Sequence, residues 1–273
     1  MHRRATSVAG RWYSDDPVQL SAEVDRYVAR AEVDPIGGPV VAIVAPHAGL
    51  MYSGPVAAFA YKVASVSGCT AAVLVGPSHY VPFEGASIWP EGAWQTPLGD
   101  IVVDADLAHG IESAWSGLVH LPAAHGREHS LEMQLPFVAR LLPGIPIVPI
   151  VMGHQTREAS FALAGALVGA IAARAGRTLL IASSDLSHYE DASTAQGLDA
   201  VVLRHVESLD PDGLMGALET EPRHACGGGP MVSVLDAARK LGASHAHVLE
   251  YADSGDVSGD KSSVVGYMAA AIW

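Results

Sequence analysis

The sequence predicts an α/β fold: a single domain, residues 1–273, in which a central mixed, largely parallel β-sheet is flanked by helices. Three observations predict it. Apolar runs of strand length alternate along the chain with segments in which apolar residues have helical spacing. Hydrophobic residues make up 49% of the 273 residues and charged residues only 16%, which is enough apolar material for one large core. The composition does not change along the chain, so nothing marks a second domain or a linker.

Six apolar runs are bounded by turn residues and have the length of β-strands. They are apolar at successive positions and not only at alternate ones, which is typical of strands buried on both faces of a parallel sheet. The predicted strands are Val40–Ala45, Ala71–Gly76, Ile145–Val151, Leu179–Ala182, His247–Tyr251 and Val264–Ala270.

Between the strands, six segments are predicted to be helices. The first follows Asp16, a capping residue, and starts at Pro17, because proline is favoured at the first helical position. The Gly-, Ser- and Asp-rich segment Asp253–Ser262 is predicted to be a mobile loop between the last two strands. The predicted helices are Pro17–Ala31, Pro55–Val66, Ser130–Leu142, Arg157–Arg174, Thr194–Leu209 and Met231–Leu241.

The net charge and the apolar pattern exclude several classes of function. The formal charge is −13, from 29 acidic and 16 basic residues, and a negative surface repels both nucleic acids and anionic membranes. No apolar run reaches the roughly 18 residues of a membrane span, and Met1–Pro17 lacks the apolar stretch of a secretory signal. The two cysteines, Cys69 and Cys226, do not indicate a disulfide framework. We therefore expect a cytoplasmic protein without nucleic-acid or membrane partners.

Polar residues follow three of the predicted strands through similar tight turns. His47, His79 and the pair Asp185 and His188 each come shortly after a different strand. In open α/β sheets, ligands bind outside the carboxyl ends of the strands, so these residues can meet in one crevice. Neutral imidazole is a common ligand of iron, copper and zinc. One such histidine alone is more often structural, but three at equivalent strand ends predict a metal site.

Cys226 is the candidate for the third metal ligand. It precedes three glycines and Pro230, which suits the first position of a helix, so its sulfur can lie beside a helix start that favours a thiolate. The alternative is that the glycine run only makes a tight turn with a close approach of the backbone. No Gly-Lys-Ser/Thr follows the run, which excludes a P-loop.

Four residues are candidates for roles beside the metal. Asp185 and His188 are spaced to face the same pocket, as acid and base or as partners of the ligands; alternatively, Asp185 only caps a turn. His129 and Glu132 open a predicted helix ahead of its apolar face. They can therefore point inward and orient the ligands, although ordinary helix capping explains much of this pattern.

A set of motifs covers most of the chain: Val8–Tyr13, Pro46–Gly49 with Tyr52–Gly54, Gly76–His79, Trp94–Gly99, Glu128–Pro136, Ser183–His188 and Cys226–Gly229. Together they resemble the Memo family, the Memo-like proteins of the AmmeMemoRadiSam type. That family is similar in fold to the class III extradiol dioxygenases (LigB-like enzymes), which use non-haem iron. By this resemblance Tyr52, like His129 and Glu132, is expected beside the ligands.

The resemblance implies that His47, His79 and Cys226 hold the metal and that Asp185 and His188 line the same pocket. Fe(II) is the expected metal, with copper or zinc as the other candidates. The dioxygenases use a glutamate where this chain has a cysteine, so cleavage of catechol rings does not carry over from the fold. The family also suggests radical-SAM and AMMECR1-like proteins as partners in the same pathway.

Three functions compete for such a site. The first is a dioxygenase-like oxidoreductase, in which the metal acts on an unknown small organic substrate or on O₂ and His188 gives or takes a proton. The second is a metal-dependent hydrolase with the same ligands and with Asp185 or His188 as the base. The third is a module that binds a peptide or phosphopeptide and has a vestigial metal site. The oxidoreductase is the leading hypothesis.

Overall fold

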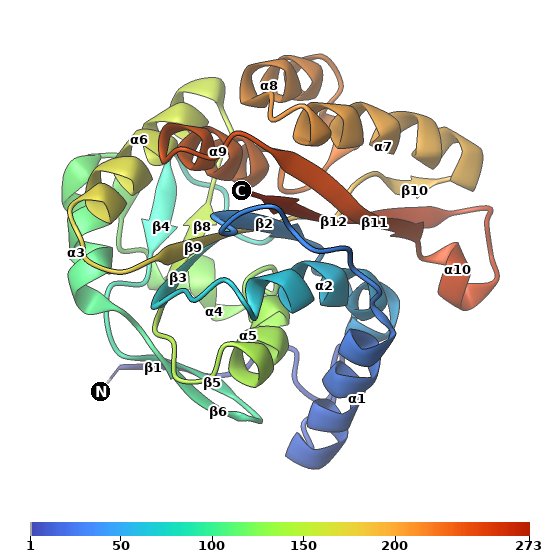
Figure 1. Cartoon of the computed structure of the whole chain (residues 1–273), viewed down its shortest axis with the longest axis horizontal. Helices are drawn as coiled ribbons and strands as arrows, with labels where there is room; N and C mark the ends of the chain where they lie inside the picture. The colour runs from blue at the N-terminus through green and yellow to red at the C-terminus, as the bar shows by residue number, and fades with distance from the viewer. Residues whose placement is uncertain (1) are drawn as a thin grey trace.

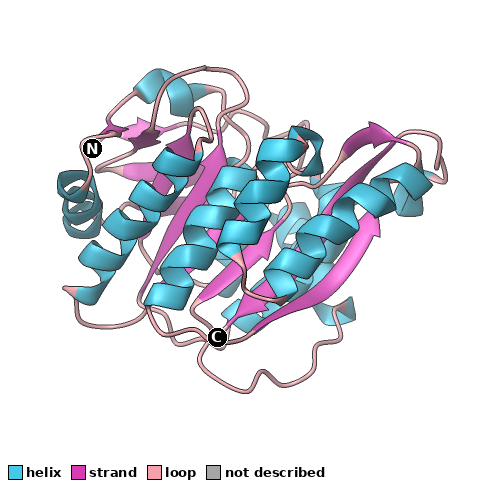
Figure 2. Ribbon diagram, turned by 90° about the horizontal axis from the view of Figure 1, so that it is seen from above, coloured by secondary structure: helices cyan, strands magenta, loops and turns pink. Residues whose placement is uncertain are grey.

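The computed structural model of the protein describes residues 2–273. Its centre is a nine-stranded mixed sheet with helices on both faces (Figure 1, Figure 2), so the predicted α/β class is confirmed. In sheet order, the strands are β10 (His188–Glu190), β12 (Val264–Ile272), β2 (Ala42–Ala45), β9 (Thr178–Ser183), β3 (Ala71–Pro77), β8 (Ile147–Met152), β4 (Ala86–Ile88) and β7 (Leu118–Val119), and β11 (Ala246–Asp253) also pairs with β12.

The four central strands β2, β9, β3 and β8 run parallel to one another, whereas β12 and β4 are antiparallel to the central strands beside them. The sheet is therefore parallel in the middle and mixed at its sides. Because β9 lies between β2 and β3, the carboxyl ends of all three meet at one edge. Ala45 is paired there with Ser183, and Val75 with Ala182.

Two layers of helices cover the sheet (Figure 2). Side chains of β3 alternate between the two cores, with Val73 and Val75 in one and Ala72 and Leu74 in the other, as expected for a strand buried on both faces. Within residues 2–273, none of the helices has both the length and the apolar character that crossing a membrane requires. One layer is α1 (Pro17–Arg30), α2 (Leu50–Ala64) and α5 (Leu135–Leu141), and the other is α3 (Ala105–Ala114), α6 (Arg157–Ala172), α7 (Ala192–Glu207), α8 (Pro211–Thr220) and α9 (Gly228–Lys240).

Two helices begin earlier than their prolines suggested. α2 begins at Leu50, and Pro55 lies inside it. α9 begins at Gly228, so Pro230 is its third residue, whereas the sequence predicted that it would be the first. Pro230 lies in the first turn, where the N–H groups have no partner within the helix, whereas Pro55 is the sixth residue of α2 and lies beyond that turn. A proline therefore places the start of a helix only to within a few residues.

Several elements, most of them short, were not predicted from the sequence pattern. The predicted helix Ser130–Leu142 begins as a 3₁₀ turn, Glu132–Gln134, and continues as α5. The predicted mobile loop Asp253–Ser262 contains a helical turn, and Lys261 forms ion pairs with acidic residues of that segment. The elements that were not predicted include a second sheet of β1 (Arg3–Arg4), β5 (Ala93–Thr96) and β6 (Gly99–Val102), the strands β4, β7 and β10, and the helices α3, α4 (Pro122–Gly126), α8 and α10 (Gly255–Ser258).

Candidate metal centre

Three neighbouring strands are each followed by a polar residue at the same edge of the sheet. His47 follows the end of β2 by two residues, His79 follows β3 by two, and Asp185 follows β9 by two. Because these strands are parallel neighbours, the three residues arrive side by side. The convergence that the sequence predicted is therefore present in the fold.

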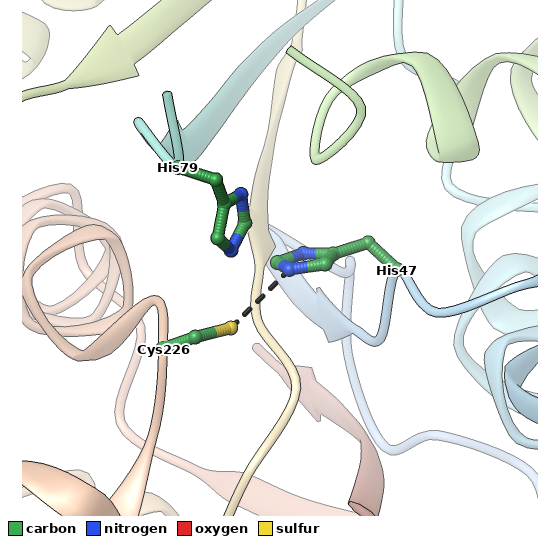
Figure 3. Close-up of side chains that lie close together, drawn as sticks. All are labelled: His47, His79 and Cys226. Carbon is green, nitrogen blue, oxygen red and sulfur yellow. Dashed lines mark hydrogen bonds between the residues drawn. The ribbon is translucent and has the colours of Figure 1, made fainter. Parts of the chain in front are cut away.

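Cys226 reaches this edge from the turn that precedes α9 (Figure 3). Its Sγ atom lies 3.2 Å from Nε2 of His47, and the imidazole of His79 points towards the same space. The candidate ligand atoms of His47, His79 and Cys226 all lie within 4.8 Å of one another. Metal–nitrogen bonds of about 2.0–2.1 Å and metal–sulfur bonds of about 2.3 Å bring ligand atoms to such separations. The three side chains thus fit a common metal ion.

The hydrogen bonds of Ser183 fix the tautomer of His47. The Ser183 hydroxyl donates its one hydrogen to the carbonyl of Ser130, at 2.7 Å, and accepts an N–H of Gln134, at 2.7 Å. It must therefore accept from Nδ1 of His47, 2.9 Å away. With the proton on Nδ1, the free lone pair of His47 is on Nε2, beside the thiol. Burial, and then the charge of His79, lowers the pKa of His47 well below its usual range, so the ring is neutral as a ligand requires.

Glu128 performs the same role for His79, and it was not predicted from the sequence. Its carboxylate accepts Nδ1–H of His79 at 2.8 Å and the backbone N–H of His79 at 2.6 Å. It also accepts the backbone N–H groups of His129 and Ser130. Burial raises the pKa of Glu128, but the bonds and charge of His79 and the N–H of Ser130 outweigh it and hold the pKa at about 2. The carboxylate is therefore ionised and leaves Nε2 of His79 free for a metal.

A second group of possible ligands, His79, Glu128 and His129, lies beside the first. The oxygens of Glu128 already accept four N–H groups, so this carboxylate orients a ligand in preference to binding a metal itself. His129 stacks on His79 with ring centroids 4.4 Å apart. Burial, followed by the charges of His47 and His79, lowers the pKa of His129 to about 4. His129 is thus a neutral neighbour of His79.

Glu132 does not contact the ligands, and this corrects the role predicted for it. Its buried carboxylate forms an ion pair with Arg4 and accepts the hydroxyl of Tyr13, at 2.8 Å, and the backbone N–H groups of Ser7 and Val8. Glu132 therefore anchors the N-terminal segment to the domain. It affects the site only indirectly, because this segment carries Trp12, whose ring packs 4.4 Å from that of His129.

The turn around Cys226 is held at both ends. Its N–H donates to the carbonyl of Asp185, at 3.2 Å, and its carbonyl accepts the side-chain amide of Gln155, at 2.8 Å. A Cβ atom on Gly227 would lie 2.5 Å from the Ser183 carbonyl oxygen, and one on Gly229 would lie 2.8 Å from Gln155 Cβ. The glycine run therefore does permit a close backbone approach, and that approach places the sulfur beside His47.

The sulfur of Cys226 is a thiol in the absence of metal. Burial, and then the charge of Asp185, raises its pKa well above the usual range. The sequence suggested that the start of α9 would favour a thiolate. That expectation is wrong for the metal-free protein, because the sulfur precedes the capping residue Gly227 and lies beside a carboxylate.

Asp185 and His188 also lie at this edge, in different roles. Oδ1 of Asp185 accepts the N–H groups of His47, at 2.6 Å, and of Ala48, at 3.2 Å. Since its carbonyl accepts the N–H of Cys226, Asp185 joins the turns that carry two of the ligands; burial raises its pKa. His188 begins β10 and is half-buried, with Nδ1 bonded to a main-chain carbonyl at 2.8 Å. Its Nε2 is left free.

Tyr52 lies in the first turn of α2 and is half-buried. Its main-chain N–H bonds to the carbonyl of Gly49, in the turn that follows His47. Within residues 2–273, its hydroxyl forms no hydrogen bond with His47, His79 or Cys226. The structure therefore brings Tyr52 near the ligand-bearing turn without a hydrogen bond to a candidate ligand.

Two small cavities adjoin the candidate ligands. One, of about 310 Å³, is lined by Cys226, Gln155, Gly228 and the side chain of Leu218. The other, of about 210 Å³, is next to His79 and Tyr80. These volumes lie at or below the lower end of the range for small-molecule sites. Together with the side chain of His79, which is 26% exposed, they suit access by a small ligand.

Comparison with known proteins agrees with the resemblance seen in the sequence. A family model described as Memo-like protein matches residues 4–271. A MEMO1 family protein of Methanothermobacter thermautotrophicus is 36% identical, over 97% of this chain and 98% of the relative. MEMO1 family proteins of Methanosarcina mazei and Methanosarcina acetivorans are 39% and 40% identical, each over 98% of both chains.

Proposed function

This chain belongs to the Memo-like protein family, and from its site we propose that it is a non-haem metal-dependent oxidoreductase. The proposed metal is iron, with copper as the nearest alternative, held by His47, His79 and Cys226. The proposed reactant is O₂ or a small organic molecule. The cavities beside Cys226 and His79 support a small reactant over a macromolecular one.

One observation carries the proposal: in both histidines Nδ1 is hydrogen-bonded to an acceptor, which leaves Nε2 for a metal. Ser183 accepts from His47, and ionised Glu128 accepts from His79. Histidines that bind metals almost always donate their other N–H in this way, because the partner fixes the tautomer and the ring orientation. Two imidazoles and a sulfur suit iron, copper or zinc, and they are too soft a set of ligands for magnesium or calcium.

When bound, the metal would supply electron transfer and open coordination positions for a reactant. Residues of the chain would position the ligands and handle protons. Asp185 keeps the turns of His47 and Cys226 at a fixed distance through its carboxylate and its carbonyl. His188, whose Nε2 is free, is placed to hold or give the proton that accompanies electron transfer.

Metal analysis of protein purified without oxygen tests the proposal. We expect about one iron or copper per chain and a change in its oxidation state when O₂ or peroxide is added. In Cys226→Ala we expect neither the bound metal nor the change in oxidation state. Stoichiometric zinc without any redox change would contradict the proposal and favour a hydrolase with the same ligands. A metal-free protein that binds peptides normally would favour a binding module.

Metal binding is expected to release a proton from Cys226. Because the pKa of the thiol is raised, the sulfur is protonated at neutral pH and must lose its proton to bind a metal. The affinity should therefore rise about tenfold per pH unit until the pH reaches that pKa. Titration calorimetry with Zn(II), in two buffers of different ionisation enthalpy, counts the protons. Cys226→Ala should release one proton fewer than the wild type; an equal count would remove the sulfur from the ligand set.

A further inference from the structure

Asp199 is a buried carboxylate that the proposed metal chemistry does not use. It lies on α7 and is fully buried. Its Oδ1 accepts the N–H of Ser187, at 2.9 Å, and its Oδ2 accepts the hydroxyl of Tyr251, at 2.8 Å. Neither partner carries a positive charge. A buried carboxylate bonded only to neutral donors is costly, so its bonds are expected to hold something that a neutral side chain would hold less well.

The segment held by Asp199 is the one that leads to His188. Gly266 of β12 brackets this segment: its N–H donates to the carbonyl of Ser187, at 3.0 Å, and its carbonyl accepts the N–H of Leu186, at 2.8 Å. A Cβ atom on Gly266 would lie 2.0 Å from Oδ2 of Asp199, so only glycine fits between them. Elements α7, β11 and β12 therefore meet at the residue immediately before His188.

The imidazole of His188 is fixed by the same segment. Its Nδ1 lies 2.8 Å from the carbonyl oxygen of Leu186, which can only accept, so Nδ1 carries a proton; within residues 2–273, Nε2 forms no hydrogen bond. Tyr189, the next residue, has φ +63°, a left-handed conformation that a non-glycine residue adopts only when its surroundings impose it. Burial raises the pKa of Asp199, and the hydrogen bonds from Ser187 and Tyr251 oppose this.

We infer that Asp199 is a positioning residue, which through Ser187 N–H and the Tyr251 hydroxyl holds His188 in one orientation and one tautomer. The inference rests on the proposed function, in which His188 handles the proton. The hydrogen bonds of Asp199 go to Ser187 and Tyr251 and not to the candidate ligands. Its effect passes through one residue of the main chain, from Ser187 to His188.

Nitrogen NMR of the His188 ring in the metal-free protein tests this inference without any catalysis. In the wild type, at a pH where the ring is neutral, we expect two separate ring signals, from a protonated Nδ1 and an unprotonated Nε2. In Asp199→Ala we expect loss of this pattern, with broadened or averaged signals. Asp199→Asn should largely restore it, because the amide oxygen can accept the N–H of Ser187. Tyr251→Phe, which removes one of the two bonds, should have a smaller effect of the same kind.

Asp191→Ala is the matched control. Asp191 caps the exposed start of α7 and bonds to Ser193 and Thr194, so its removal loosens the same helix without touching Ser187. His188 signals that stay as in the wild type in Asp199→Ala and Tyr251→Phe would overturn the inference. So would an equal change in Asp191→Ala.

A second measurement separates this inference from the proposed function. In iron-loaded protein, Asp199→Ala should keep its metal affinity but react with peroxide about tenfold more slowly, the size of effect expected for a residue outside the ligand set. If wild-type protein shows no redox reaction, the proposed function fails while the NMR result still decides the role of Asp199. If the NMR signals do not change, the inference fails whatever the metal does.

Discussion

Replacing Cys226 by alanine is expected to lower the metal affinity of this protein by more than about 100-fold and to leave the fold intact. Loss of a residue that only orients a ligand costs about 10–100-fold, so loss of one of three ligands should cost more. The thiol makes only weak contacts, to His47 Nε2 at 3.2 Å and to the Asp185 carbonyl at 3.6 Å, so the free energy of unfolding should fall by no more than about 1 kcal/mol. Competition with a coloured chelator gives the affinity, and thermal unfolding gives the stability.

The chain contains a matched control for that experiment. Cys69 is its only other cysteine and lies before β3, away from the candidate ligands. Cys69→Ala should bind metal as the wild type does, whereas His47→Ala and His79→Ala should lose affinity like Cys226→Ala. Full occupancy in Cys226→Ala, or an equal loss in Cys69→Ala, would contradict the assignment.

Replacing Glu128 by alanine should have the second largest effect, on both stability and metal binding. The change leaves Nδ1–H of His79 and the buried N–H groups of His79, His129 and Ser130 without their acceptor. Removing one partner of a buried charged pair costs about 3–5 kcal/mol, so a loss of that size in the unfolding free energy is expected. Since His79 can then change its tautomer, metal affinity should fall by about 10–100-fold.

Denaturant unfolding and metal titration of the same preparations measure both effects. Glu84 is an exposed carboxylate, so Glu84→Ala should change the unfolding free energy by less than about 0.5 kcal/mol. Glu128→Gln should be intermediate, because its amide oxygen can still accept. Wild-type stability and affinity in Glu128→Ala would show that the carboxylate does not orient His79.

The ionised state of Glu128 also predicts how stability depends on pH. Its pKa is about 2 in the folded protein, against the ordinary value of 4.5. The carboxylate therefore contributes its full stabilisation above about pH 4.5 and loses it as the pH falls towards 2. At 1.36 kcal/mol per pKa unit this is about 3 kcal/mol. Between pH 4.5 and 2, the unfolding free energy of the metal-free wild type should fall by this amount more than that of Glu128→Gln. Parallel curves of unfolding free energy against pH for the two proteins would contradict the prediction.

The candidate ligands could be predicted from the sequence because of where they stand relative to buried strands. β2, β3 and β9 are apolar on both faces, so their ends are visible, and His47, His79 and Asp185 follow those ends directly. The parallel order of these strands then brings the residues together. Cys226 was found from its glycines, whose small size the close contacts of Gly227 and Gly229 require.

The partners of the ligands could not be predicted in the same way. Glu128 lies 49 residues from His79 in the sequence and reaches it through a short irregular segment before α5. Glu132, one turn further along the chain, has the same side chain but forms an ion pair with Arg4, near the N-terminus. Which of the two carboxylates orients a ligand depends on the path of that segment, and no periodicity fixes such a path. Strands of two or three residues, such as β1 and β4, are likewise too short to show a pattern.

The claim that a redox-active metal is held by two imidazoles and one sulfur can be tested directly by X-ray absorption at the metal edge, on protein purified and loaded with Fe(II) without oxygen. We predict one sulfur and two imidazole nitrogens bound to the iron in the wild type, loss of the sulfur in Cys226→Ala, and a shift of the edge when O₂ is admitted. Iron bound only to nitrogen and oxygen in the wild type, or a spectrum that Cys226→Ala does not change, would contradict the account.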